Sequence, residues 1–248
     1  MSGRCVGTPR GAALTELAAV AIAPLVPARQ VVERMDHAVL QAVVARRPDA
    51  VRIPAVRLTE LAEPAVIVPL CVVAAARALS RRTPPPEVLG QLGWAAAGIG
   101  IRRGLAETVR RGRPPPAWWW HFPSGFSYPS RHVTWAVLGL GTAADLCGGG
   151  PGYRRAAAAL TAAVVATRVL LAVHWPSDVV AALVYSAAWR QLSTSTPPRR
   201  PGVRTAADRL LRAPHVVDVG ALPATAAAVQ PADVADDRRR ERGSRQIG

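Results

Sequence analysis

Residues 167–178, with the sequence TRVLLAVHWPSD, begin inside one apolar segment and end at the start of the next. Ionisable side chains are costly in such surroundings, so Arg168, His174 and Asp178 point to a role beyond packing. On a helix, the spacing of four places the imidazole of His174 and the carboxylate of Asp178 on one face. The carboxylate orients the histidine and leaves its other ring nitrogen free to attack an electrophile or move a proton. The Arg168 guanidinium adds a donor fork for phosphate oxygens, so the stretch predicts phosphoryl chemistry at a membrane surface.

The composition is typical of a membrane protein. The chain has 248 residues, of which 50% are hydrophobic and only 5% aromatic, and its mean hydropathy is +0.16. All 31 basic residues are arginine, and the net charge is +15. These arginines are spread through loops between apolar segments, which favours anionic lipid over nucleic acid as their partner. The three cysteines have no disulfide or metal-ligand spacing, so no metal site is expected.

Six apolar stretches predict an all-α fold, a polytopic transmembrane bundle of about six helices. They cover residues 11–28, 58–79, 88–101, 132–147, 156–173 and 175–192. The third must continue through Arg102 and Arg103 to reach the roughly 20 residues that span a bilayer. The first contains Pro24 and Pro27, and it is either a retained span or a signal peptide.

The chain divides into three regions. Residues 1–57 hold the weak first span and an amphipathic connector at 29–57, which is either an interfacial helix or a solvated one. Residues 58–192 are expected to form the membrane core that carries the chemistry. Residues 193–248 are dense in Ala, Arg and Asp without a sustained apolar face, and we expect a disordered cytoplasmic tail.

The arginine pairs predict the orientation in the membrane. Arg81-Arg82 and Arg154-Arg155 flank short loops, which should remain on the cytoplasmic side. The loop of residues 104–131 and the His174 junction then lie on the opposite side. We therefore expect an integral protein of a bacterial plasma membrane with its site facing the extracytoplasmic side.

The long outer loop supplies a second set of candidate residues. It contains Arg113-Pro114 and ends in Pro129-Ser130-Arg131-His132, at the entrance of the fourth apolar stretch. The start of a helix offers free backbone N–H groups and a positive dipole end to an anion. Ser130 can cap that helix and donate to phosphate, and His132 can protonate a leaving alcohol while His174 attacks from the other side.

These residues resemble the three motifs of the type 2 phosphatidic acid phosphatase (PAP2) superfamily. The motifs are a lysine followed by six residues and Arg-Pro, then Pro-Ser-Gly-His, then Ser-Arg followed by five residues and His-x-x-x-Asp. The matching positions are Arg113 and Pro114; Pro129, Ser130 and His132; and Arg168, His174 and Asp178, with Thr167 in place of the serine. The resemblance covers about residues 58–192.

Two further positions depart from the family pattern. Ala106 stands where the first motif has its lysine, and Arg131 stands where the second has glycine. Arg103 and Arg110 lie on the helical face of Ala106, so either guanidinium can replace the lysine at the phosphate. Arg131 either contacts the phosphate or crowds the loop, because glycine lets the backbone approach an anion.

The resemblance implies an integral membrane phosphatase that hydrolyses a lipid phosphate or diphosphate monoester. In that mechanism His174 attacks phosphorus to form a phosphohistidine, Asp178 orients His174, and His132 protonates the departing oxygen. The oxygens of the phosphate are held by Arg113, Arg168 and Ser130. No metal or organic cofactor is required. The expected partners are a lipid phosphate or polyprenyl (di)phosphate substrate and membrane lipids, with no nucleic acid.

Two other functions fit the same residues. A phosphotransferase of the same superfamily would pass the phosphoryl group from His174 to an alcohol instead of water. A catalytically weakened protein that binds lipid phosphate is the second, and it is motivated by Ala106 and Arg131. The sequence decides neither the lipid nor the oligomeric state.

Overall fold

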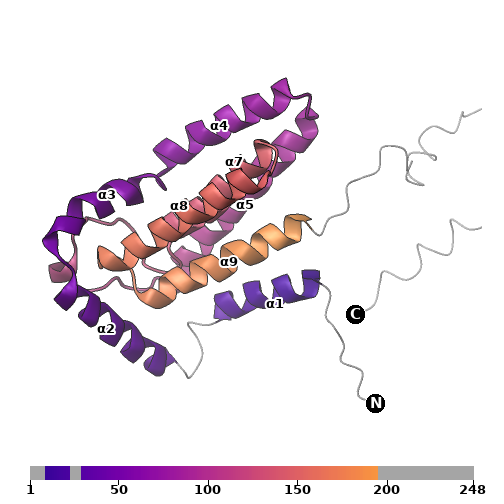
Figure 1. Ribbon diagram of the computed structural model, residues 1–248. Coiled ribbons are helices and arrows are strands. Elements are labelled where there is room, and N and C mark those ends of the chain that lie inside the picture. Colours follow the sequence, from indigo (N-terminus) through magenta and orange to yellow (C-terminus); the bar gives the residue numbers. More distant parts are fainter. Residues whose placement is uncertain (1–8, 23–28, 195–248) are drawn as a thin grey trace, which may run out of the picture. The chain divides into compact units, whose positions relative to one another are not determined.

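The computed structural model describes residues 9–22 and 29–194, and every regular element in this part of the chain is helical (Figure 1). The helices are α1 (Pro9–Ile22), α2 (Arg29–Arg46), α3 (Arg52–Glu60), α4 (Pro64–Ser80), α5 (Pro85–Val109), α6 (Arg131–Trp135), α7 (Gly141–Leu146), α8 (Pro151–Leu170) and α9 (Pro176–Thr194). A π-helical stretch, η4 (Ala136–Leu140), joins α6 to α7, and short 3-10 turns lie at η2 (Asp49–Val51) and η3 (Pro116–Trp118). The predicted all-α fold is confirmed.

Each of the six apolar stretches lies mainly on a helix within the described residues, which leave out 23–28 of the first stretch. In chain order they correspond to α1, α4, α5, the continuous segment α6-η4-α7, α8 and α9. Helix α5 continues through Arg102 and Arg103 to Val109. This agrees with the expectation that the third stretch extends past these arginines. Taken singly, no helix of the described residues is both long and apolar enough to cross a membrane. The pair Asp49–Glu60 and Pro64–Ser80, bent by 46°, passes that test together.

The helices of the N-terminal segment pack directly on the core. Helix α1 lies along α9, α2 contacts α8 and α9, and α3 contacts α8 (Figure 1). The Tyr128 hydroxyl, far along the chain, donates to the carbonyl of Val20 on α1 at 2.6 Å. The predicted tail, residues 193–248, lies outside the described residues except for the last two residues of α9. Pro24 and Pro27 also lie outside them.

Local chemistry sets the ends of these helices. Proline opens α4, α5, α8 and α9, because it has no N–H to leave unpaired and its fixed φ suits a first helical turn. Arg110 ends α5 with a left-handed φ of 49°, and Ala172 follows α8 with a φ of 55°. The chain therefore turns sharply just before His174 and re-enters a helix at Pro176.

Helices α5 and α9 are clasped by aromatic residues. The indoles of Trp94 and Trp189 stack with their centroids 4.5 Å apart, and each Nε1 donates to the other residue's carbonyl. The Tyr185 hydroxyl donates to the carbonyl of Gly98 at 2.6 Å, and a Cβ at Gly98 would lie 2.6 Å from the Trp189 ring nitrogen. An aromatic pair contributes about 0.5–1.5 kcal/mol beyond its buried area. The clasp holds together the two helices that carry Arg102 and Asp178.

Short arginine-rich loops lie at one end of these helices. Arg81, after α4, donates to the carbonyl of Cys147, after α7. Asp145 on α7 pairs with Arg190 on α9 at 2.8 Å and lies 3.6 Å from Arg154 on α8. The chain order places the starts of α6 and α9 at the other end, together with the candidate site residues.

Candidate active site

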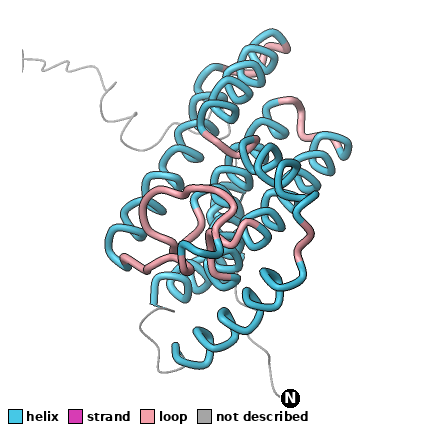
Figure 2. Tube along the Cα trace, turned by 90° about the vertical axis from the view of Figure 1, so that its left-hand side faces the viewer, coloured by secondary structure: helices cyan, strands magenta, loops and turns pink. Residues whose placement is uncertain are grey.

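The candidate site lies where α8 ends, α9 begins and the long loop between α5 and α6 returns. This loop, residues 110–130, lies across the helices and is the longest pink segment in Figure 2. The backbone N–H of Trp120 donates to the carbonyl of Leu171, and that of Ser127 donates to the carbonyl of Arg111. The two halves of the predicted site, 113–132 and 168–178, are thus brought together.

His174 is fully buried at the centre of this region. Its Nδ1 lies 3.6 Å from Oδ2 of Asp178 and 3.5 Å from Oγ of Ser127, and its Nε2 lies 3.2 Å from Nη1 of Arg113. Burial, and then the charge of Arg168, lowers the pKa of His174 well below its ordinary value of 6.5. The ring is therefore neutral at pH 7. Because a guanidinium can only donate, we assign the proton to Nδ1 and the lone pair to Nε2.

Asp178 is fully buried and is held by donors from three directions. Its Oδ2 accepts the backbone N–H of Trp175 at 2.9 Å and the hydroxyl of Ser127, and its Oδ1 accepts Nη1 of Arg111 at 2.6 Å. Asp178 is the third residue of α9, so its bond to the Trp175 N–H is the carboxylate half of a capping box. One carboxylate therefore caps α9 and faces His174.

Arg113 joins the long loop to the segment before His174. Its guanidinium donates to the carbonyl of Val173 at 2.6 Å and to the carbonyls of Ser124, Gly125 and Phe126 at 2.8–3.1 Å. Gly125 has a φ of 69°, a conformation that favours glycine. Burial lowers the pKa of Arg113 to about 10, so it remains a cation at pH 7 beside Nε2 of His174.

Four buried side-chain atoms in the described part of the chain have no hydrogen-bond partner, and three of them belong to predicted site residues. They are Oγ of Ser130, Nδ1 of His132 and Nε of Arg168. Ser130 stands at the N-cap of α6 without capping it, and Arg168 donates through Nη1 to Thr59 at 2.7 Å. Buried polar groups are normally paired, so these three have hydrogen-bonding capacity left for a polar ligand. Among the described residues, no group of three or more His, Cys, Asp or Glu could hold a metal ion.

A carboxylate that was not among the predicted site residues pairs with the second histidine, His132. Oε1 of Glu63, at the start of α4, lies 2.7 Å from Nε2 of His132 and 3.0 Å from Nη2 of Arg131. The hydrogen bond with His132 lowers the pKa of Glu63 to about 2, so Glu63 is ionised at pH 7. Arg131, predicted as a phosphate ligand, is therefore paired with a side chain of the protein.

The structure does not bring Arg103 or Arg110 to the site. Arg103 is exposed on α5, and Arg110 is exposed with its Nε donating to the carbonyl of Glu107. Arg102 is buried instead, and its Nε donates to the carbonyl of Pro129 at 2.8 Å. Arg102 precedes Ala106 by four residues, so both lie on the inward face of α5. From the sequence we expected Arg103 or Arg110 on this face, although Arg102 also has a spacing that places it there.

Comparison with known proteins agrees with this geometry. Residues 91–201 match the family model described as the PAP2 superfamily. The PAP2 resemblance is confirmed. The three PAP2 motifs of this chain all lie inside the matched segment. Thr59, Glu63 and Asp36 lie outside it, although they contact residues of the site.

A solved PAP2 structure shares the fold. It is described as the crystal structure of the first transmembrane PAP2 type phosphatidylglycerolphosphate phosphatase from Bacillus subtilis. The superposition has a TM-score of 0.64 at 21% sequence identity, and it covers 78% of this chain and 100% of the other. At that identity the likeness shows a common fold alone. No curated protein matches the chain.

Proposed function

We propose that this PAP2 protein is an integral membrane phosphatase that hydrolyses a lipid phosphate or diphosphate through a phosphohistidine at His174. One observation carries the proposal: buried side-chain groups without a hydrogen-bond partner belong to Ser130 and His132 of the second motif and to Arg168 of the third motif, which also contains the buried His174. A phosphate can pair with all three groups, because it both accepts from Arg and Ser and carries the oxygen that a histidine protonates.

In the first step Nε2 of His174 attacks phosphorus, and the bond between phosphorus and the lipid oxygen breaks. A lipid phosphate leaves as an alcohol and a lipid diphosphate leaves as the lipid monophosphate, and in each case the departing oxygen takes a proton from His132. Because Glu63 faces Nε2 of His132, Nδ1 is the nitrogen left for that proton transfer. Burial and the charges of Arg168 and Arg131 oppose protonation of the His132 ring, whereas the charges of Glu63 and of a bound phosphate favour it. Water then attacks the phosphohistidine, which releases inorganic phosphate and restores His174.

Three arginines supply the positive charge that the transferred group requires. Arg168 and Arg113 are the motif residues, and both lie close enough to His174 for their charges to act on it. We assign to Arg102 the charge that the family lysine would provide, because its buried guanidinium holds the loop at Pro129, just before Ser130. Fixed cations and donors in a site that excludes water stabilise the transition state without reorganising.

The surface of α4 supports a location in the membrane. This helix exposes apolar side chains along its length: Val66, Val68, Leu70, Val72, Val73 and Leu79. Such a run is unusual for water-facing helices and suits contact with lipid tails. The arginine loops around Arg81 and Arg154 lie at the end of the helices away from the site, which supports an active site on the extracytoplasmic side of the plasma membrane.

A phosphate-release assay on the full chain in detergent tests this function. The substrates are phosphatidic acid, phosphatidylglycerol phosphate and a polyprenyl diphosphate, each with and without a chelator. We expect phosphate release from at least one, and loss of that release in His174→Ala. Unchanged release by His174→Ala would exclude this nucleophile. A phosphorylated alcohol in place of inorganic phosphate would show phosphotransfer instead.

A further inference from the structure

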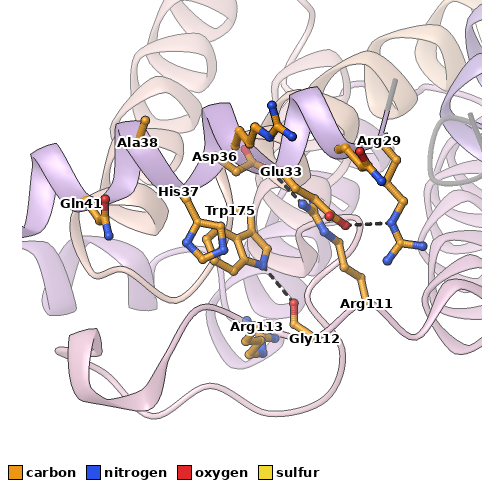
Figure 3. Close-up of a pocket in the computed structure, with 12 residues that line it drawn as sticks. Arg29, Glu33, Asp36, His37, Ala38, Gln41, Arg111, Gly112, Arg113 and Trp175 are labelled. Carbon is orange, nitrogen blue, oxygen red and sulfur yellow. Dashed lines mark hydrogen bonds and ion pairs between the residues drawn. The ribbon is translucent and has the colours of Figure 1, made fainter. Parts of the chain in front are cut away.

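Helix α2 lies outside the segment that matches the PAP2 model, yet one of its side chains enters the network behind His174. Asp36 is 3% exposed, which is unusual for a carboxylate on a helix with an otherwise exposed face. Figure 3 shows Asp36 on α2 facing Arg111, which extends from the long loop toward it. Burial of an ionised carboxylate requires strong partners, so its contacts carry the argument.

Arg111 bridges two buried carboxylates. Its Nη2 donates to Oδ2 of Asp36 at 2.7 Å, and its Nη1 donates to Oδ1 of Asp178 at 2.6 Å. Asp178 in turn lies 3.6 Å from Nδ1 of His174. The guanidinium is planar and rigid, so fixing one edge on Asp36 also fixes the direction of the edge that meets Asp178.

Ser177 closes the same network at the start of α9. Its backbone N–H donates to Oδ1 of Asp36 at 2.9 Å, and its hydroxyl donates to Oδ2 of Asp36. The hydroxyl also accepts Nη1 of Arg111 at 2.7 Å. Asp36 thus satisfies a free N–H of the first turn of α9 from another helix, where a negative charge is favourable.

We propose that Asp36, acting through Arg111, is a positioning residue for Asp178 and His174. This inference rests on the proposed function. Neither side chain touches phosphate in this assignment. Asp36 anchors Arg111 and the start of α9, Arg111 holds Oδ1 of Asp178, and Oδ2 of Asp178 stays directed at His174. Helix α2 is therefore part of the catalytic unit, although it precedes the PAP2 segment.

A double-variant cycle on the full chain tests the link. Asp36→Asn should lower kcat about tenfold with KM within about twofold, and Arg111→Gln should lower kcat about 100-fold. Because Asp36 acts through Arg111, the double variant should be no slower than Arg111→Gln alone. Arg111→Lys should recover part of the loss, because it keeps a charge at Asp178 without bridging both carboxylates.

Glu33→Gln is the matched control. Glu33 lies three residues before Asp36 on α2 and pairs with Arg29 at the surface, so its loss should leave kcat unchanged. An unchanged kcat in Asp36→Asn, or losses that multiply in the double variant, would overturn the proposal. If Asp36→Asn yields no folded protein, Ser177→Ala takes its place in the cycle with the same criteria. A wild type that releases no phosphate contradicts the proposed function and this inference together, whereas an active wild type with an unaffected Asp36→Asn contradicts this inference alone.

Discussion

The molecule contains two carboxylate–histidine pairs, and they differ in origin. Asp178 and His174 are four residues apart, and both side chains are completely buried. Glu63 and His132 are 69 residues apart, and the Glu63 side chain is 31% exposed. The first pair is built by one helix start and its preceding turn, whereas the second requires α4 to meet α6. In the proposed mechanism the first pair holds the nucleophile and the second holds the acid, and only the second includes a carboxylate that solvent reaches.

The largest effect should come from the buried pair. Asp178→Asn keeps the shape of the side chain but favours the wrong tautomer of His174, so kcat should fall about 1,000-fold or more. The loss should be equal for a lipid phosphate and for p-nitrophenyl phosphate, because both need the nucleophile. Steady-state release of phosphate and nitrophenol measures it. A loss below tenfold would show that Asp178 does not orient His174.

A smaller and more selective effect should follow from the second pair. Glu63→Gln should lower kcat for a lipid phosphate about 10- to 100-fold, because the leaving alcohol needs a proton from His132. p-Nitrophenolate leaves without that proton, so its release should change little. Glu60→Gln is the matched control, since Glu60 lies one turn earlier and pairs with Arg57 at the surface. Equal losses on both substrates would remove the role in acid catalysis.

Two adjacent arginines on α5 extend the contrast between buried and exposed groups. Arg102→Gln should lower kcat/KM about tenfold or more, because it removes a fixed cation from the site. Arg103→Gln should leave kcat/KM unchanged, since Arg103 is exposed. The two variants change the net charge equally and can be compared in one assay. Matching effects would contradict the assignment of Arg102 to the phosphate.

The smallest effects concern stability against pH. The pKa of His174 is lowered from 6.5, so the unfolded chain binds this proton first, and stability is lost as pH falls below about 6.5. The pKa of Glu63 is lowered from 4.5 to about 2, so its contribution is present above pH 4.5 and is lost toward pH 2. Thermal melting in detergent should show both windows. Glu63→Gln should flatten the more acidic window, and a window between pH 4.5 and pH 2 that persists in this variant would contradict the contribution of Glu63.

The sequence predicted the residues that lie close together in the chain better than those that tertiary packing brings together. His174, Asp178 and Arg168 stand close together in the chain, so their order in the sequence was enough to unite them. The predicted shared helical face of His174 and Asp178 is wrong, because His174 lies in the turn between α8 and α9 and only Asp178 is helical. Each apolar stretch also became a helix, because long apolar runs between prolines have few other ways to satisfy their backbone. Local spacing and composition were therefore enough to predict the helical fold and the part of the site in residues 168–178.

The remaining residues depend on tertiary packing. Glu63 and Asp36 enter the site from helices that precede the PAP2 segment, and neither belongs to a motif. The choice between Arg102 and Arg103 depends on the rotation of α5, which the clasp of Trp94, Gly98 and Trp189 sets against α9. Residues three and four positions apart both share a helical face, so spacing alone cannot decide whether Arg102 or Arg103 points inward with Ala106.

That clasp also gives the protein an optical signal of its own. Stacked indoles with centroids 4.5 Å apart couple their electronic transitions, and Trp94 and Trp189 lie on the two helices that carry Arg102 and Asp178. The near-ultraviolet circular dichroism of this pair therefore reports the spacing of α5 and α9 without any added label. The arrangement of the proposed catalytic centre can be followed from a pair of tryptophans that take no part in it.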